Sequence, residues 1–146
     1  ARGDATDDDV RDALVALGIE DRFLSLPDGL DTEVQERGSR FSAGEKQLVS
    51  LARAALVDPA VLVLDEATSS LDPGTELLVE RALERLMVGR TSLVIAHRLS
   101  TAERCDRVAV VNDGRLVEIG PHEELVARGG AYADLFASWS GGLAAR

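Results

Sequence analysis

The chain has 146 residues, 45% of them hydrophobic, which suits one domain, or a large part of one, with a real core. Its formal net charge of −10 disfavours nucleic acid as a partner, because a phosphate-binding protein usually presents a basic face. Its one cysteine excludes an internal disulfide, and no apolar run approaches the roughly 20 residues that span a bilayer.

The first 57 residues are expected to be helical. The expected helices are Thr6–Leu17, Arg22–Leu26 and a longer helix from Ser42 to the Asp58-Pro59 pair, with Leu30–Arg40 polar and irregular between them. The stretch Ser42–Glu45 has the S-x-x-E pattern of a capping box, which predicts where the longer helix begins. Its apolar residues fall on one face, which we expect to be buried: Leu48, Leu51, Ala52, Ala55 and Leu56.

The remaining residues, 58–146, alternate between strands and helices. The expected strands are Val61–Leu64, Thr91–Ala96, Arg107–Val111 and Arg115–Ile119, the last two joined by a turn at Asn112-Asp113-Gly114. One expected helix begins at Asp72-Pro73 and buries Val79, Leu83 and Leu86, and a short one begins at a second capping box, Ser100–Glu103. Two further helices are expected at His122–Arg128 and Ala131–Trp139. This order predicts an α/β fold with a mainly parallel sheet, in which residues 1–57 form a helical lobe and residues 58–146 a sheet lobe. The continuous apolar run at Val61–Leu64 is typical of a central parallel strand.

Candidate catalytic residues follow two of these strands. Asp65 and Glu66 come directly after the first apolar strand, and His97 comes after the second. In an open parallel sheet, ligands bind beyond the carboxyl ends of the strands. One acid there could hold Mg²⁺, the other could activate water, and the histidine could donate to a phosphate, a set that suits phosphoryl transfer. The alternatives are that the acids only begin a turn or helix and that the histidine is structural.

Five segments resemble the C-terminal part of the nucleotide-binding domain of ATP-binding-cassette (ABC) transporters, most closely the exporter type. "FSAGEKQLVSLARAAL" resembles the LSGGQ signature and its helix, "VLVLDEATSSLD" the Walker B motif and D-loop, and "VIAHRLST" the switch-histidine loop. "TEVQERG" is similar to the exporter x-loop, and "VVNDGRLVEIGPHEELVARGGAYADLF" to the exporter tail. The order and spacing match over nearly the whole chain. The implied fold is the C-terminal part of a P-loop NTPase, with a partial helical signature subdomain at 1–57 and a RecA-like core with tail helices at 58–146.

The resemblance implies a role for each site residue, with ATP and Mg²⁺ as ligands. Asp65 would hold Mg²⁺, Glu66 would be the general base, and His97 would contact the γ-phosphate. Asp72 would reach across a dimer interface to the partner's site. The signature residues would face ATP on the opposite subunit of a head-to-tail dimer: Ser42, Ala43, Gly44 and Glu45. A helix N-terminus with small residues offers free N–H groups to phosphate, and a larger side chain at Gly44 would hold the phosphate away.

Three departures from the family pattern matter, and the signature reads F-S-A-G-E rather than L-S-G-G-Q. Ala43 adds a methyl group where the signature usually has Gly, and Gln35 replaces the usual Gly of the x-loop. Glu45 replaces Gln and would bring a negative charge near a triphosphate. Two placements of Glu45 are open: the capping box favours a side chain folded back onto the N–H of Ser42, and otherwise the composite site is weakened.

A Walker A loop, G-x-x-x-x-G-K-[ST], is absent, since the only lysine is Lys46 inside the signature helix. We therefore expect this chain to be a fragment that is inactive alone. The rest of the nucleotide-binding domain and all transmembrane helices would lie before Ala1. The whole protein would be an ATPase that powers efflux and lies at the cytoplasmic face of the cell membrane. Its partners would be a second nucleotide-binding domain, in a homodimer or heterodimer, and the transmembrane domains of the same transporter. The transported substrate is open, because transmembrane helices select it.

Two other functions compete with this one. The chain could be a non-catalytic or degenerate half that dimerises without hydrolysing ATP, for which Ala43 and Glu45 leave room. It could also be the head lobe of a chromosome-maintenance ABC ATPase. The latter should follow a long heptad coiled coil, and Pro27 and the glycines before Phe41 break any such helix.

Overall fold

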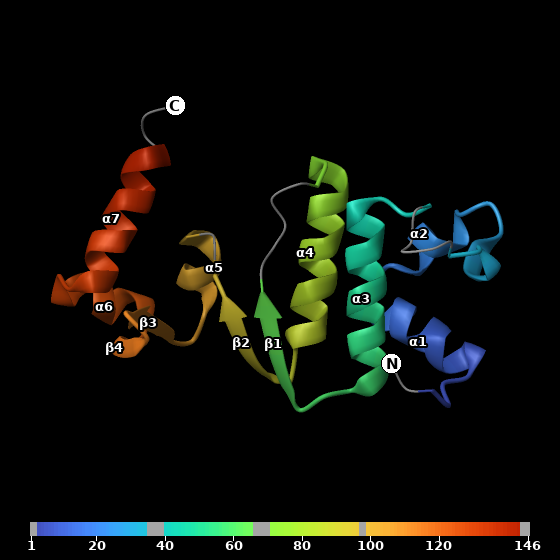
Figure 1. Cartoon of the computed structure of the whole chain (residues 1–146), viewed down its shortest axis with the longest axis horizontal. Coiled ribbons are helices and arrows are strands. Elements are labelled where there is room, and N and C mark those ends of the chain that lie inside the picture. Colours follow the sequence, from blue (N-terminus) through green and yellow to red (C-terminus); the bar gives the residue numbers. More distant parts are fainter. Residues whose placement is uncertain (1–2, 35–39, 66–70, 97–98, 144–146) are drawn as a thin grey trace. The chain divides into compact units, whose positions relative to one another are not determined.

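The computed structural model describes residues 3–34, 40–65, 71–96 and 99–143 and divides the chain into two compact units, Ala1–Val94 and Ile95–Arg146. The first unit contains helices α1 (Asp7–Leu17), α2 (Glu20–Leu24), α3 (Ala43–Val57) and α4 (Pro73–Met87), a 3₁₀ turn η1 (Gly29–Asp31), and strands β1 (Val61–Asp65) and β2 (Thr91–Ile95) (Figure 1). The second contains helices α5 (Leu99–Arg104), α6 (His122–Arg128) and α7 (Ala131–Leu143) and strands β3 (Val108–Asn112) and β4 (Arg115–Gly120). The predicted order of helices and strands is confirmed. The predicted lobe boundary after residue 57 stays a prediction.

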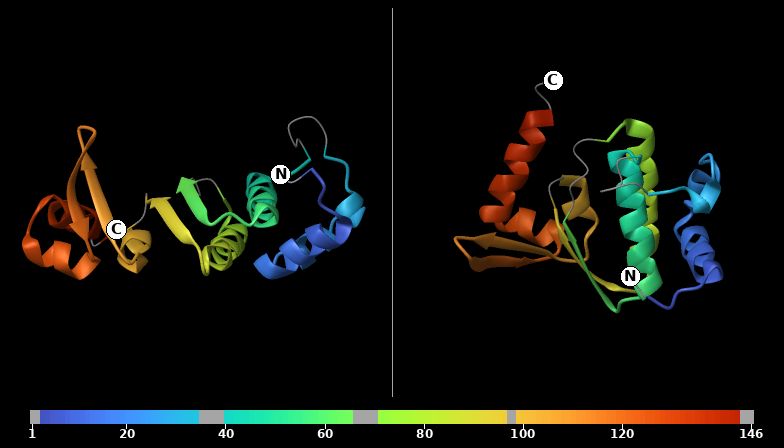
Figure 2. Two further views of the ribbon diagram at one scale, coloured as in Figure 1. Left: turned by 90° about the horizontal axis from the view of Figure 1, so that it is seen from below. Right: turned by 45° about the vertical axis from the view of Figure 1, so that its right-hand side comes forward.

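The core of the first unit forms where α1, α3 and α4 pack together with one face of β1 (Figure 2). It consists of buried aliphatic residues and one aromatic residue: Leu14, Leu17, Ile19, Phe23, Leu48, Leu51, Ala52, Leu62, Val79, Ala82 and Leu86. The predicted buried face of α3 is confirmed for its first three positions, while Ala55 and Leu56 are only half-buried. Each fully buried leucine contributes about 1.5–3 kcal/mol, so this packing holds the two helices that carry the candidate site residues.

Local capping explains where the main helices begin and end. The side chain of Thr6 caps α1 in a capping box with Asp9, and Gly18 ends that helix in the left-handed conformation at φ 67°. Helix α3 ends at Asp58, whose φ is 47°, and Pro59 prevents its continuation. These boundaries agree with the sequence prediction.

The sheet of the first unit is half covered. Strand β1 pairs with β2, and the two arrows point the same way (Figure 1). Leu62 is 5% exposed, whereas Val61 and Val63 on the opposite face are 59% and 67% exposed. In the part of the chain that the structure describes, β1 is therefore buried on one face only, and its place at the centre of a larger sheet stays a prediction.

The second unit is built on the predicted hairpin. Strands β3 and β4 pair antiparallel, and the two loop residues, Asp113 and Gly114, have φ of 48° and 73°, as a tight primed turn requires. Leu125 and Tyr132 pack on this hairpin with Ala102 and Val110. Each hairpin strand ends one residue later than predicted, at Asn112 and Gly120, and β3 begins at Val108 rather than at the predicted Arg107.

Boundary predictions for three of the helices are wrong. Ser100 does not cap α5, because that helix already begins at Leu99; the Ser100 carbonyl accepts a hydrogen bond from Nε of Arg104 at 3.2 Å instead. Helix α2 begins at Glu20 and ends at Leu24, so it is shifted toward the N-terminus from the predicted Arg22–Leu26. Helix α7 continues past Trp139 to Leu143.

Candidate functional site

The signature turn, Ser42–Glu45, begins α3 with a complete capping box. The Ser42 hydroxyl accepts a hydrogen bond from the Glu45 N–H at 3.2 Å, and the Ser42 N–H donates to Oε2 of Glu45 at 2.7 Å. The predicted box is confirmed. No described residue accepts a hydrogen bond from the N–H groups of Ala43 and Gly44, the first two helical positions. These N–H groups, at the positive end of the helix dipole, are the kind of donors that an anionic phosphate takes.

The Glu45 side chain folds back onto the N-cap residue. It is only 7% exposed, and its second oxygen, Oε1, accepts a hydrogen bond from Nη2 of Arg22 in α2 at 2.6 Å. Burial raises the pKa of this carboxyl, but the hydrogen bonds from Ser42 and the charge of Arg22 outweigh it and hold the pKa below the usual range. Of the two open placements, the folded-back one is confirmed.

Gly44 brings the signature turn against the first turn of α4. A Cβ atom at this position would lie 2.0 Å from Cγ2 of Thr75 and 3.5 Å from Cδ2 of Leu71. Such a contact is far shorter than van der Waals distance, so α3 and α4 approach this closely only because residue 44 has no side chain. This requirement arises within the chain and is separate from the predicted need for space near a phosphate.

Asp72 lies at the N-cap of α4 and is exposed. Its Oδ1 accepts a hydrogen bond from the Thr75 N–H at 3.0 Å. Hydrogen bonds from the side chain and the N–H of Thr75 hold the pKa of Asp72 below its ordinary value, so the carboxylate is charged near neutral pH. This local capping role agrees with the predicted start of the helix, and the role across a dimer interface stays a prediction.

Asp65 is the last residue of β1 and is exposed at its carboxyl end. Glu66 and His97 lie outside the described residues. The arrows of β1 and β2 point toward the end of the unit where α3 and α4 begin (Figure 1). An exposed carboxylate at a strand end suits a hard cation that keeps much of its water, and Asp65 is therefore a suitable Mg²⁺ ligand. No group of three His, Cys, Asp or Glu residues that could hold a metal alone occurs in the described part of the chain.

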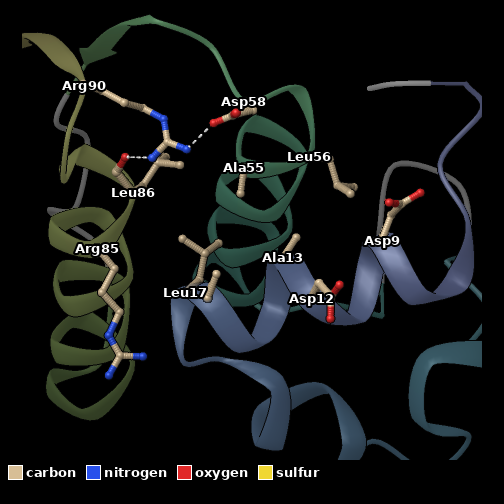
Figure 3. Close-up of a pocket in the computed structure, with 11 residues that line it drawn as sticks. Asp9, Asp12, Ala13, Leu17, Ala55, Leu56, Asp58, Arg85, Leu86 and Arg90 are labelled. Atoms are coloured by element: carbon tan, nitrogen blue, oxygen red, sulfur yellow. Dashed lines mark hydrogen bonds and ion pairs between the residues drawn. The ribbon is translucent and has the colours of Figure 1, made fainter.

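A cavity in the first unit lies away from the signature turn. It has a volume of about 290 Å³ and is lined by residues of α1, the C-terminal end of α3 and α4, among them Asp12, Ala55 and Arg85 (Figure 3). Arg90 in its wall is already paired with Asp58 at 2.6 Å. Helix α3 has 15 residues and is about 22 Å long, and this cavity lies at the opposite end from the signature turn.

Comparisons with known proteins agree with this arrangement. The family described as ABC transporter matches residues 3–69. The ABC transporter ATP-binding protein YknV of Bacillus subtilis is 49% identical over 92% of this chain and 22% of its own length. The heavy metal tolerance protein of Schizosaccharomyces pombe is 50% identical over 93% of this chain and 16% of its own. An ATP-dependent lipid A-core flippase of Thiobacillus denitrificans is 49% identical over 94% of this chain and 24% of its own.

A solved structure of a bacterial Atm1-family ABC exporter with ATP bound matches with a TM-score of 0.80 and 42% identity, over 94% of this chain and 24% of that one. The fold is that of a P-loop NTPase. The chain belongs to the ABC transporter family and corresponds to the C-terminal part of an exporter-type nucleotide-binding domain. It spans less than a quarter of the length of the relatives named here.

Two residues beside the site were missed by the sequence prediction. Arg22 lies 23 residues before Glu45, and Thr75 lies 31 residues after Gly44, so neither contact follows from helical periodicity or a local motif. The one sequence signal for the contact between Arg22 and Glu45 is an acid in a predicted capping box that follows a helix with a basic residue.

Glu45 should make the stability of the complete nucleotide-binding domain depend on pH. Its pKa is lower in the folded state than the reference value of 4.5, so its stabilising contribution is present above that pH and is lost as the pH falls through the folded-state pKa. We expect the difference in unfolding free energy between wild type and Glu45→Gln to shrink as the pH is lowered from neutral, measured by urea denaturation. The exposed Glu123→Gln variant is the control, and a difference for Glu45 that is independent of pH would contradict the assignment.

Proposed function

We propose that this chain is part of the ATP-hydrolysing engine of an ABC exporter, which works as a head-to-tail dimer of nucleotide-binding domains. The observation that carries the proposal is the signature turn, whose N–H groups at Ala43 and Gly44 lack a partner among the described residues while both oxygens of Glu45 are already bonded to Ser42 and Arg22. A Glu that pointed along the helix axis would repel a triphosphate. The folded-back carboxylate leaves the turn suited to an anion and so favours an active over a degenerate signature.

The remaining site residues have separate roles in this proposal. Asp65 holds Mg²⁺, which when bound neutralises charge on the phosphates. Glu66 accepts a proton from the attacking water, and His97 contacts the γ-phosphate. Asp72 reaches the partner's site from the start of α4. Residues 1–57 act as the helical signature subdomain and residues 58–146 as the C-terminal part of the RecA-like core.

The partners in this proposal are a second nucleotide-binding domain and the transmembrane domains of the same transporter, at the cytoplasmic face of the cell membrane. Within the described ranges, no helix has the length and apolar character needed to cross a bilayer. Helices α1 and α2, with 11 and 5 residues, do not form a continuous heptad coiled coil directly before the signature turn. The names of the relatives include heavy metal tolerance and a lipid A-core flippase, and the proposal concerns the ATPase rather than the cargo.

Calorimetry with Mg-ATP tests whether this chain needs the rest of the transporter to bind ATP. We expect no detectable binding to the 146-residue chain alone up to millimolar ATP, because its sequence has no Walker A loop to hold the phosphates. The complete transporter in lipid nanodiscs should bind ATP and hydrolyse it, and a chelator of Mg²⁺ should abolish hydrolysis.

Micromolar binding by the isolated chain would reveal a phosphate site outside the signature turn and would require new roles for these residues. Absence of ATP hydrolysis by the complete wild-type transporter would overturn the proposed function itself.

A further inference from the structure

The signature turn contains a negative charge, the carboxylate of Glu45, that should repel the triphosphate of ATP. Glu45 is the third residue of α3, directly after the two residues whose N–H groups lack partners, and its lowered pKa keeps it ionised at neutral pH. An uncompensated carboxylate so close to the helix N-terminus would cancel much of the positive potential that attracts phosphate.

The structure shows how this charge is compensated. Oε2 of Glu45 accepts the Ser42 N–H and Oε1 accepts Nη2 of Arg22, so each carboxylate oxygen has a partner. In the described part of the chain, Arg22 is the one cation within ion-pair distance of Glu45. The Glu45 side chain is 9% exposed and that of Arg22 is 44% exposed, so one partner is shielded from water and the other remains hydrated. Water therefore screens this pair less than a fully exposed one.

We propose that Arg22 is a positioning residue of the composite ATP site, and this inference rests on the proposed function. Its ion pair makes Glu45 electrically equivalent to a neutral amide and holds the carboxylate against the N–H of Ser42. Arg22 thereby keeps the N–H groups of Ala43 and Gly44 attractive to the triphosphate of the opposite subunit. Helix α2 is thus coupled to nucleotide binding without touching nucleotide.

A double-mutant cycle in the complete transporter tests this inference. The variants are Arg22→Met, Glu45→Gln and the two combined, with ATP turnover measured against ATP concentration. Met keeps the apolar stem of Arg without its charge, and Gln keeps an oxygen that can accept the Ser42 N–H. We expect Arg22→Met to raise KM for ATP roughly fivefold with a much smaller change in kcat, because an unpaired charge weakens ATP binding. The combined variant should return KM to the value of Glu45→Gln.

Two further variants separate charge from packing. Arg22→Lys keeps the charge and should keep KM near the wild-type value. Arg11→Met removes the more exposed pair with Glu20, at 3.9 Å, and should leave KM and kcat unchanged. If Arg22→Met yields too little folded transporter, the combined variant decides: a KM equal to that of Glu45→Gln supports the inference, and a raised KM overturns it.

The outcomes also separate this inference from the proposed function. An Arg22→Met variant with wild-type KM, or a combined variant no better than Arg22→Met, overturns the role of Arg22 while an active wild type still supports the ATPase. An inactive wild type overturns both.

Discussion

Replacing Glu66 by Gln in the complete transporter should lower kcat for ATP hydrolysis by about a hundredfold to ten-thousandfold, with ATP still bound. The amide has nearly the same shape as the carboxylate but cannot accept a proton from the attacking water. In the proposed site, binding depends on other groups, among them the signature turn and Asp65, so we expect the variant to retain ATP and accumulate as a nucleotide-bound dimer. Turnover and retained nucleotide are measured on the same preparation.

Glu123→Gln is the matched control, because it removes one carboxylate from an exposed position in the first turn of α6. It should leave kcat unchanged. If the Glu66→Gln variant turns over at the wild-type rate, Glu66 is not the general base. Undiminished turnover would then have to come from the other composite site of a heterodimer, in which the site containing Glu66 is the impaired one.

The sequence predicted those parts of the structure that short-range chemistry determines. The starts of α1, α3 and α4 follow from Thr6, Ser42 and Asp72, whose side chains bond to N–H groups three residues away. The folded-back Glu45 was predictable for the same reason. Ser100 shows where this reasoning fails, because a capping pattern also occurs inside a helix when the preceding residue, here Leu99, is already helical.

The parts that could not be predicted depend on contacts between distant residues. The exposure of Val61 and Val63 depends on what covers the sheet, which a run of apolar letters does not specify. The pairing of Arg22 with Glu45 and the approach of Gly44 to Thr75 depend on how α2 and α4 pack on α3. The candidate site is therefore recognisable from its motifs, whereas the residues that position it are visible only in the structure.

The second large effect is expected at Gly44. Replacing it by Ala would place a Cβ atom 2.0 Å from Cγ2 of Thr75, and α3 and α4 must separate to relieve the contact. Rotating the Thr75 side chain would move its hydroxyl away from Asp72, whose pKa that hydroxyl helps to lower. Overpacking costs about 1–3 kcal/mol, partly offset by about 1 kcal/mol from the higher helix propensity of Ala. A displacement of the signature turn by about 1 Å could lower turnover about a hundredfold.

Combining Gly44→Ala with Thr75→Ser separates packing from the need for space near phosphate. Serine lacks the colliding methyl group and keeps the hydroxyl near Asp72, and the closest remaining atom, Cβ of residue 75, would be 3.2 Å from the new Cβ. We expect the combined variant to recover both the free energy of unfolding and most of the turnover, because the added methyl points into α4. Thr75→Ser alone is the reference. Recovery of stability without turnover would instead mean that the methyl at residue 44 keeps the phosphate away from the helix N–H groups, as the family resemblance predicts.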